Sequence, residues 1–338
     1  MDFLTAGDIK HKNGETTHYY EGGSKEGTPI IFLHGWPDLA ESWKHQLSHF
    51  AAGNKYRVIA ADMRGYGGSS APKTKESYSL QTLVSEMVEF AEQLGIQKAI
   101  WVAHDWGCGL GNALAVHHPE LFIGLANLCV PYRCIELGFD FMVSTVNRDI
   151  YPEKEYKYGQ WEYLHHYMQQ PEESVKVFET NVEGITKVFY LKSDPKTYGK
   201  PAPTSTIVKD GGWFGGHPEN LPDIPLAITS LDEHLYNSLV ASKKKNGWFG
   251  PVAWYLNHDA NAEYAKSEKN GGVLEFPVLY IDAKYDVICS AGLAPKLAES
   301  QKKATKNLSV ETIEASHWVQ LEKPKETNEA LEKWMSTF

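Results

Sequence analysis

The sequence predicts an α/β protein with a mostly parallel central sheet, helices on both faces of that sheet and an inserted, mainly helical segment. Short apolar runs without polar alternation recur along the chain, as expected of strands buried on both faces. Helical segments separate these runs, which is typical of parallel strands joined by helices. The alternation stops over residues 132–254. We therefore expect a core formed by residues 1–131 and 255–338, with a helical cap at 132–254.

Composition and charge narrow the class of protein. The 338 residues are 42% hydrophobic and 22% charged, which is ordinary for a globular protein with a large core and an insertion. The net charge of −10 and the lack of a basic block argue against nucleic acid as a partner. No apolar run approaches the roughly 20 residues that span a membrane. Residues 1–10 lack the apolar region of a secretory signal, so we expect a cytoplasmic protein without membrane insertion.

The first part of the chain shows the alternation clearly. An Asn-Gly pair at 13–14 predicts an opening hairpin. Predicted strands follow at 29–33, 57–61, 100–103 and 124–130. Predicted helices lie at 41–50, at 79–94 and from the residues after 105 to about 117. The helix at 79–94 is the clearest, because its apolar residues fall on one face and Gly95 is placed to cap its end.

The alternation resumes after the insertion. Strands are predicted at 277–281 and 308–311, and helices from about 290 and over 322–338. Ligands of parallel sheets bind beyond the carboxyl ends of the strands. Four residues with suitable chemistry come just after predicted strands, and we expect them to share one site: His34, Asp105, Asp286 and His317.

The segment 100–107, Ile-Trp-Val-Ala-His-Asp-Trp-Gly, predicts a strand, a sharp turn and a helix. It has the small-x-nucleophile-x-small pattern of a nucleophile elbow, with Ala103 and Gly107 as the small residues. The apex is Asp105 instead of Ser or Cys. A carboxylate that attacks a saturated carbon leaves an ester that activated water can cleave, whereas a hydroxyl would leave an ether. Asp105 therefore indicates displacement on an epoxide or an alkyl halide, and a helix cap is the alternative interpretation.

Such a reaction also needs a base, an orienting acid and an oxyanion hole. His317, after the last predicted strand, is the candidate base, and Asp286, after the preceding strand, is the candidate acid. Asp282 is a rival acid, but its place near the strand end favours a structural role. The order nucleophile, acid, base is that of α/β-hydrolases. The backbone N–H groups of Trp36 and Trp106 are the candidate oxyanion donors.

Four motifs together resemble those of epoxide hydrolases of the α/β-hydrolase fold, the soluble or microbial type. In chain order they are His34-Gly-Trp-Pro37, Asp62-Met-Arg-Gly-Tyr-Gly67, His104-Asp-Trp-Gly107 and Ser316-His-Trp318. The resemblance extends over nearly the whole chain. It implies a covalent alkyl-enzyme ester on Asp105, hydrolysed by water that His317 and Asp286 activate. It also implies a small hydrophobic epoxide and water as partners, with no cofactor. The four cysteines lack CxxC spacing, so no metal is expected.

The resemblance further implies two cap tyrosines that protonate the oxygen of the opening epoxide. A phenol with a pKa of about 10 can donate a proton and still be protonated at neutral pH. Tyr255, within Gly250–Asn257, matches the second of these tyrosines. Tyr163, within Trp161–Tyr167, matches the first, and Tyr167, one helical turn further on, is the alternative.

Two other functions are compatible with the same motifs. Haloalkane dehalogenases share the aspartate elbow, and such an enzyme would release halide without needing the two phenols. A non-catalytic small-molecule receptor on the same fold would bind its ligand tightly with negligible turnover. Nucleotide binding is disfavoured, because the glycines at 107–111 have GxGxG and not GxGxxG spacing.

Two further predictions concern a loop and two aromatic segments. Asp62 and Arg64 are expected to brace a loop and not to touch substrate. The aromatic segments 212–215 and 247–250 are predicted either to line a hydrophobic pocket or to anchor the cap to the core.

Overall fold

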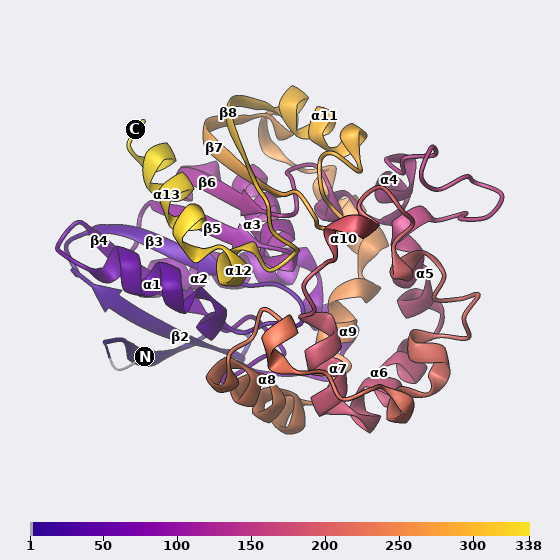
Figure 1. The fold of residues 1–338 in the computed structure, drawn as a ribbon. Helices are drawn as coiled ribbons and strands as arrows, with labels where there is room; N and C mark the ends of the chain where they lie inside the picture. The colour runs from indigo at the N-terminus through magenta and orange to yellow at the C-terminus, as the bar shows by residue number, and fades with distance from the viewer. Residues whose placement is uncertain (1–2) are drawn as a thin grey trace.

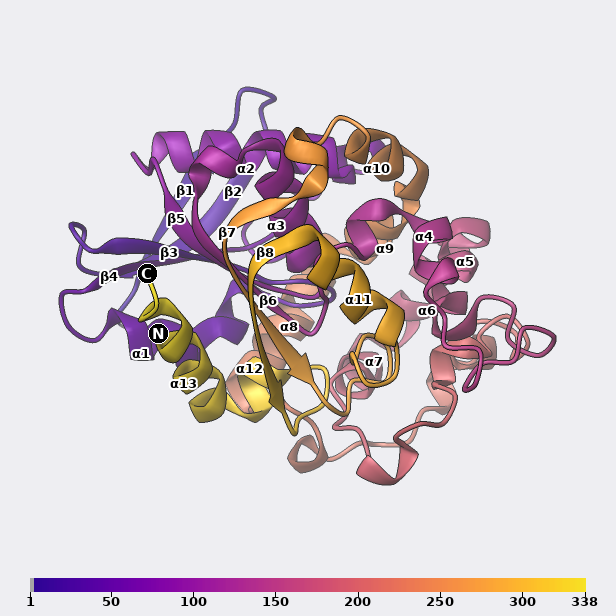
Figure 2. The same cartoon turned by 90° about the horizontal axis from the view of Figure 1, so that it is seen from above.

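The computed structural model describes residues 3–338, so residues 1 and 2 of the N-terminal segment considered above lie outside the described part. An eight-stranded sheet crosses the molecule, with helices on both of its faces (Figures 1 and 2). The strands are β1 Thr5–Lys10, β2 Thr16–Gly23, β3 Thr28–Leu33, β4 Tyr56–Ala61, β5 Ala99–His104, β6 Phe122–Leu128, β7 Leu274–Ala283 and β8 Thr305–Ile313.

The strand order is β1-β2-β4-β3-β5-β6-β7-β8. β2 pairs antiparallel with β1 and with β4, and all the remaining neighbours in the sheet are parallel. The opening hairpin is thus the antiparallel edge of a sheet whose other strands run in one direction. The predicted α/β class with a mostly parallel sheet is confirmed.

Side chains of the central strands alternate between two hydrophobic cores, one on each face of the sheet. In β3, Ile31 and Leu33 belong to one core and Ile30 and Phe32 to the other, and all four are fully buried. This explains why the strand is apolar throughout and shows no alternation in the sequence. The helices that cover the sheet are α1 Lys44–Ala51, α2 Leu80–Gln93, α3 Trp106–His117, α11 Pro295–Ala304, α12 Val319–Glu322 and α13 Pro324–Met335.

Between β6 and β7 the chain forms helices and one isolated bridge, Leu191 to Thr229, but no named strand. Figure 1 shows these helices gathered to one side of the sheet. They are α4 Phe139–Ser144, α5 Glu162–Gln169, α6 Pro171–Thr180, α7 Val182–Phe189, α8 Glu233–Asn246, α9 Phe249–Ala253 and α10 His258–Ala265. None of the helices within residues 3–338 is long and apolar enough to cross a membrane.

Several predicted boundaries are shifted for local reasons. The strand predicted at 124–130 ends earlier because Cys129 adopts a φ of 70°, which is not extended. The closing helix predicted at 322–338 is interrupted, because Pro324 begins a new helix, α13, directly after α12. The helix predicted from about 290 begins at Pro295 for the same reason.

Candidate active site

β5 delivers Asp105 to the start of α3 through a sharp turn. Asp105 has φ 53° and ψ −124°, a backbone conformation that residues other than glycine rarely adopt. Such strain at a strand-to-helix turn is typical of a nucleophile elbow. A Cβ atom on Gly107 would collide with the backbone of Leu33, and one on Gly35 would collide with Asp105 itself. The turn therefore requires glycine at both positions.

Two backbone donors face the Asp105 carboxylate. The N–H of Trp36 donates a hydrogen bond of 2.6 Å to Oδ1, and the backbone of Trp106 also favours the charged form of the carboxylate. Burial raises the pKa of Asp105, while the nearby His317 charge and these two N–H groups oppose the increase. Both predicted oxyanion donors thus lie in positions where they stabilise negative charge on the Asp105 carboxyl group.

His317 lies between two carboxylates. Its Nδ1 donates a hydrogen bond of 2.7 Å to Asp286 Oδ2, and its Nε2 is 3.6 Å from Asp105 Oδ2. Asp286 Oδ1 accepts two further bonds, from the N–H groups of Ile288 and Cys289. Burial by itself lowers the pKa of His317, but the Asp286 and Asp105 carboxylates raise it to about 9. The structure therefore brings together three of the four residues expected to share one site, in the order nucleophile, base, acid. The fourth, His34, does not line the cavity described below, and its Nε2 accepts the N–H of Met63 at 2.8 Å.

The rival acid, Asp282, hydrogen-bonds elsewhere. Its Oδ1 accepts the N–H of Ala291 at 2.8 Å and the hydroxyl of Tyr280 at 3.3 Å. Burial raises the pKa of Asp282, whereas the His317 charge and its hydrogen bond outweigh burial at Asp286 and lower the pKa there. Asp286 is the carboxylate that faces His317.

A cavity of about 690 Å³ extends from Asp105 toward the helical insertion. Its wall includes Asp286 and His317 as well as Asp105. The remaining wall is rich in aromatic side chains, among them Trp36, Trp106, Tyr163, Phe189, Trp213 and Tyr255. Apolar walls with a few convergent polar groups are typical of pockets for small organic molecules.

The two predicted tyrosines both line this cavity. Tyr163 comes from α5 and Tyr255 follows α9, and their ring centroids are 5.8 Å apart. Burial is the main cause that raises the pKa of both phenols well above its usual value, so both hydroxyls carry their protons. Tyr167 does not line the cavity, and its buried hydroxyl has no hydrogen-bond partner within residues 3–338. This placement favours Tyr163 over Tyr167.

Comparison with known proteins identifies the family of the chain. Residues 28–177 match the protein family described as α/β hydrolase fold. Epoxide hydrolase srdG of Neurospora crassa is 30% identical over 325 residues, which cover 91% of this chain and 86% of the relative. The chain belongs to the epoxide hydrolase family. The family resemblance predicted from the motifs is thus confirmed.

Other members of the epoxide hydrolase family match over different lengths. Bifunctional epoxide hydrolase 2 of Sus scrofa is 32% identical over 99% of this chain but only 56% of its own length. The chain thus spans about half the length of the bifunctional epoxide hydrolases that it matches. A solved structure of a Vigna radiata epoxide hydrolase mutant aligns with a TM-score of 0.78 over all of both chains at 24% identity, which shows the shared fold.

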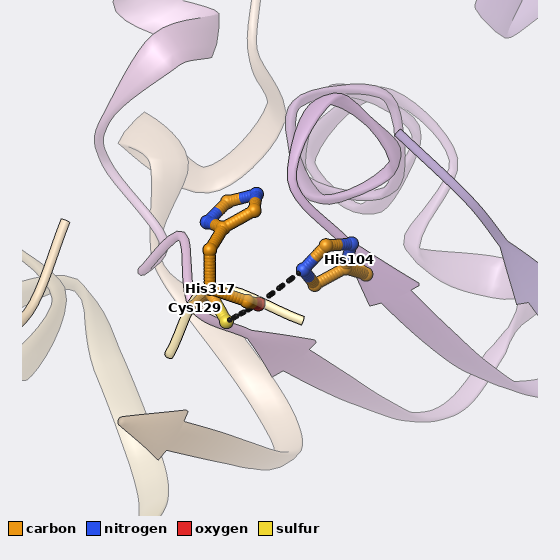
Figure 3. A group of neighbouring side chains, drawn as sticks. All are labelled: His104, Cys129 and His317. Atoms are coloured by element: carbon orange, nitrogen blue, oxygen red, sulfur yellow. Dashed lines mark hydrogen bonds between the residues drawn. The ribbon is translucent and has the colours of Figure 1, made fainter. Parts of the chain in front are cut away.

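The loop that carries His317 is held by two side chains that the sequence analysis missed (Figure 3). His104 Nε2 donates to the His317 carbonyl oxygen at 2.8 Å, and Cys129 Sγ donates to the same oxygen at 2.9 Å. Burial, together with the His317 charge, lowers the pKa of His104, so its ring is neutral. The side-chain nitrogen and sulfur atoms of His104, Cys129 and His317 lie within 4.8 Å of one another, a spacing that is also found in metal sites. Their shared contact with one carbonyl explains the grouping.

The two aromatic segments have different roles. Trp213, in 212–215, lines the cavity. Trp248, in 247–250, is fully buried and packs against Trp36 at a ring distance of 6.2 Å. One segment forms part of the pocket wall and the other anchors the insertion to the core. Next to that anchor, the backbones of Gly65 and Gly250 touch, and a Cβ on Gly250 would lie 2.9 Å from Gly65 Cα.

Asp62 and Arg64 hold the loop after β4 in place. Asp62 accepts hydrogen bonds from the N–H groups of Ala40 and Gly68. Arg64 forms a buried ion pair with Glu86. These contacts fit the expected bracing role, and neither residue lines the cavity.

Proposed function

We propose that this protein is an epoxide hydrolase that converts small hydrophobic epoxides to vicinal diols with water. The observation that carries the proposal is the placement of Asp105 on a strained elbow, beside His317 and at the floor of an aromatic cavity. The names of the relatives support it. The two phenols in the cavity wall favour an epoxide over an alkyl halide, because a departing halide needs no proton.

In the first step, Asp105 Oδ2 attacks an epoxide carbon and the ring C–O bond breaks. Oδ1 stays with the Trp36 N–H, so it becomes the carbonyl oxygen of the new ester. The departing oxygen develops the charge of a strongly basic alkoxide. Tyr163 and Tyr255 hold this oxygen and supply a proton, which is general acid catalysis.

In the second step, His317 removes a proton from water, and the water oxygen attacks the ester carbonyl carbon. Ester formation removes the Asp105 charge, one of the charges that raise the pKa of His317. The imidazole is then a better match to its role as a base. Asp286 stabilises the imidazolium, and the Trp36 and Trp106 N–H groups hold the oxyanion. The bond between the ester carbonyl carbon and the diol oxygen then breaks, that oxygen takes up the proton of the new carboxyl group, and the diol leaves with Asp105 again a carboxylate. The proton held by His317 returns to the tyrosine that gave its own to the epoxide oxygen, so both residues regain their starting states.

We also propose that residues 132–254 form a cap on a core made of 1–131 and 255–338. The cap supplies Tyr163, and Tyr255 lies just beyond its end. After this point α10 packs against α2 of the core, which supports a boundary near residue 254. Substrate then binds between a core that supplies the nucleophile and a cap that, together with the residue just beyond its end, supplies the proton donors.

The proposal is tested by mixing a His317→Gln variant with a styrene-oxide-type epoxide and recording the mass of the intact protein. The variant should form the ester but not hydrolyse it. We expect a mass increase equal to the whole epoxide, on the peptide that contains Asp105. The double variant Asp105→Asn/His317→Gln is the control and should show no adduct.

Each other outcome has a distinct meaning. A wild-type enzyme that turns over the epoxide while His317→Gln gives no adduct would contradict the covalent mechanism. A wild-type protein inert toward epoxides but active with haloalkanes, with release of halide, would support dehalogenation. Tight epoxide binding without any turnover would support the receptor.

A further inference from the structure

Ser316 and Trp318, the residues on either side of His317, have no part in the chemistry proposed above. Both side chains are buried. They are the outer members of the Ser-His-Trp motif, whose central residue is the candidate base. The two outer residues of this motif therefore need an explanation of their own, and their contacts with the insertion supply one.

Trp318 contacts the end of α7, a helix of the insertion. Its indole Nε1 donates a hydrogen bond of 2.9 Å to the Phe189 carbonyl oxygen. The ring of Tyr190, the next residue of the insertion, stacks on Trp318 at a centroid distance of 4.0 Å and an interplanar angle of 13°. Tyr190 is fully buried, so solvent does not reach this stack. The insertion thus holds Trp318 both at its edge and on its face.

Ser316 contacts the same part of the insertion. The N–H of Ser193 donates a hydrogen bond of 2.7 Å to Ser316 Oγ. Residues 189–193, which we call the 189–193 segment, therefore bind the residue before His317 and the residue after it. The candidate base lies between two points at which the insertion holds its loop.

The 189–193 segment is itself fixed within the insertion. Leu191 pairs with Thr229 in the isolated bridge, and next to this bridge the N–H of Ser230 donates to the Tyr190 carbonyl at 2.9 Å. A backbone that is paired in this way has lost much of its freedom before it contacts the loop of His317. The segment can therefore hold that loop in one place.

Tyr190 also contacts the loop of an oxyanion donor. Its hydroxyl donates a hydrogen bond of 2.8 Å to Asp38 Oδ1, and both side chains are buried. Hydrogen bonds to carboxylates are among the stronger ones in proteins. Asp38 follows Trp36 by two positions. One residue of the insertion thus contacts the loops of His317 and Trp36, the two groups needed when water attacks the ester.

We propose that the 189–193 segment positions His317 for the second step, so that the insertion serves ester hydrolysis as well as proton donation. His104 and Cys129 hold the His317 carbonyl from the core (Figure 3), and the segment holds the residues on both sides of it. A base must lie within hydrogen-bond reach of the water it activates, and a displacement of about 1 Å can cost roughly 100-fold in rate. This role rests on the proposed epoxide hydrolase function.

Contacts that only fastened the insertion to the core would behave differently. Their loss would lower the melting temperature and the amount of active protein, but an ester that had already formed would be hydrolysed at the wild-type rate. A positioning role predicts slower hydrolysis of the ester at an unchanged rate of ester formation. The two steps separate because the turn between β5 and α3, and not the loop of His317, places Asp105.

The test compares Ser316→Ala with the matched control Ser174→Ala. Ser316 does not line the cavity, and Ser174 is a buried serine of α6 whose Oγ donates to the Gln170 carbonyl. Enzyme in excess is mixed with a styrene-oxide-type epoxide, and mass spectrometry of quenched samples follows the formation and decay of the ester. For Ser316→Ala we expect formation at the wild-type rate and decay about three- to tenfold slower, the range for one hydrogen bond. Ser174→Ala should change neither rate.

Trp318→Phe tests the contact on the other side of His317, because it removes the indole N–H. Trp318 also lines the cavity, so its effect is measured on the decay of the ester and not on kcat/KM. We expect slower decay again, and a still slower decay in Ser316→Ala/Trp318→Phe. The control is Trp334→Phe, since Trp334 is a buried residue of α13 whose Nε1 has no hydrogen-bond partner within residues 3–338.

Decay at the wild-type rate in both Ser316→Ala and Trp318→Phe would overturn the inference, as would slower ester formation with unchanged decay. If one of the two variants does not fold, the other decides. His317→Gln, measured in the same series, separates this inference from the proposed function. If it accumulates the ester, the proposed function stands whatever the other variants show. If neither it nor the wild type forms an ester, the proposed function fails, and the inference fails with it.

Discussion

The two halves of the candidate site are built in different ways. Asp105, Asp286 and His317 follow strands of one sheet, so the backbone of the core fixes their positions. Tyr163 comes from the insertion and Tyr255 directly follows its end, and aromatic packing, including that of their two rings, holds them. In the core half, hydrogen bonds hold the charged carboxylates and His317 in place. In the other half, neutral phenols lie in an apolar wall. In the proposed mechanism, the position of the nucleophile is therefore tied to the sheet, and the position of the proton donors depends on how the insertion packs.

The largest effect should come from the core half. Asp105→Asn removes the nucleophile but keeps the size of the side chain, so we expect kcat to fall by about 10⁴-fold or more. Burial disfavours the native charge, so the melting temperature should not decrease. Steady-state turnover and thermal unfolding measure the two effects. Substantial residual turnover, with no deamidation of the introduced asparagine seen by mass spectrometry, would exclude Asp105 as the nucleophile.

Replacement of Asp286, the candidate orienting acid, should give the next largest effect. Asp286→Asn removes the charge that stabilises the imidazolium, and we expect a decrease in kcat of roughly 10³- to 10⁴-fold, with accumulation of the alkyl-enzyme. Asp282→Asn is the matched control and should retain most of the activity. Rapid mass spectrometry during turnover detects the ester. Equal losses in the two variants would remove the distinction between Asp286 and Asp282.

The insertion half should show smaller losses. Tyr163→Phe and Tyr255→Phe each remove one proton donor, and we expect each to slow ester formation by about 10²-fold, since the second phenol remains. Tyr167→Phe is the control and should change the rate little. Single-turnover measurements of adduct formation isolate this step. A loss at Tyr167 as large as that at Tyr163 would reverse their assignment.

The pH dependence of stability tests the charges around His317. Its pKa in the folded protein is about 9, above the value of about 6.5 expected in the unfolded chain. Its contribution is therefore fully present below pH 6.5 and is lost as the pH rises through 9. We expect the difference in melting temperature between wild type and His317→Gln to shrink over this range. A constant difference would show that the carboxylates do not bind the imidazolium.

The smallest effect should come from the contact beneath His317. Cys129→Ala removes a weak donor to the His317 carbonyl, so we expect kcat to fall about two- to threefold, the low end for one hydrogen bond. Cys108→Ala is the control, because its thiol bonds to the Leu128 carbonyl instead. Steady-state kinetics with both variants at the same pH makes the comparison. Equal kcat values for the two variants would show that Cys129 does not support the loop that carries His317.

Sequence patterns predict the core half well because its determinants are local. Apolar runs mark the buried strands, and Asp105 directly follows one of them. His317 lies in the loop after β8, a strand of mixed polarity. Element ends were less accurate, since they depend on single residues such as Cys129, whose backbone leaves the extended region, and Pro324, which starts a new helix.

The missed residues depend on contacts between distant segments. His104 holds a carbonyl 213 positions further along the chain, and no local pattern indicates this pairing. Its place beside Asp105, and that of Cys129 just after β6, are the available signals. The fold of the insertion could not be derived for the same reason. Its aromatic segments look alike in sequence, yet Trp213 lines the cavity and Trp248 does not.

The contact between Gly65 and Gly250 limits how this fold can be recombined. One glycine belongs to the core and the other to the last part of the insertion, and their backbones meet without room for a Cβ atom between them. A chimera that takes its insertion from another family member must bring a glycine to this crossing point. A Cβ atom at Gly250 would lie 2.9 Å from Gly65 Cα and 2.7 Å from the Tyr78 hydroxyl, so a larger residue there would force the surrounding structure to shift.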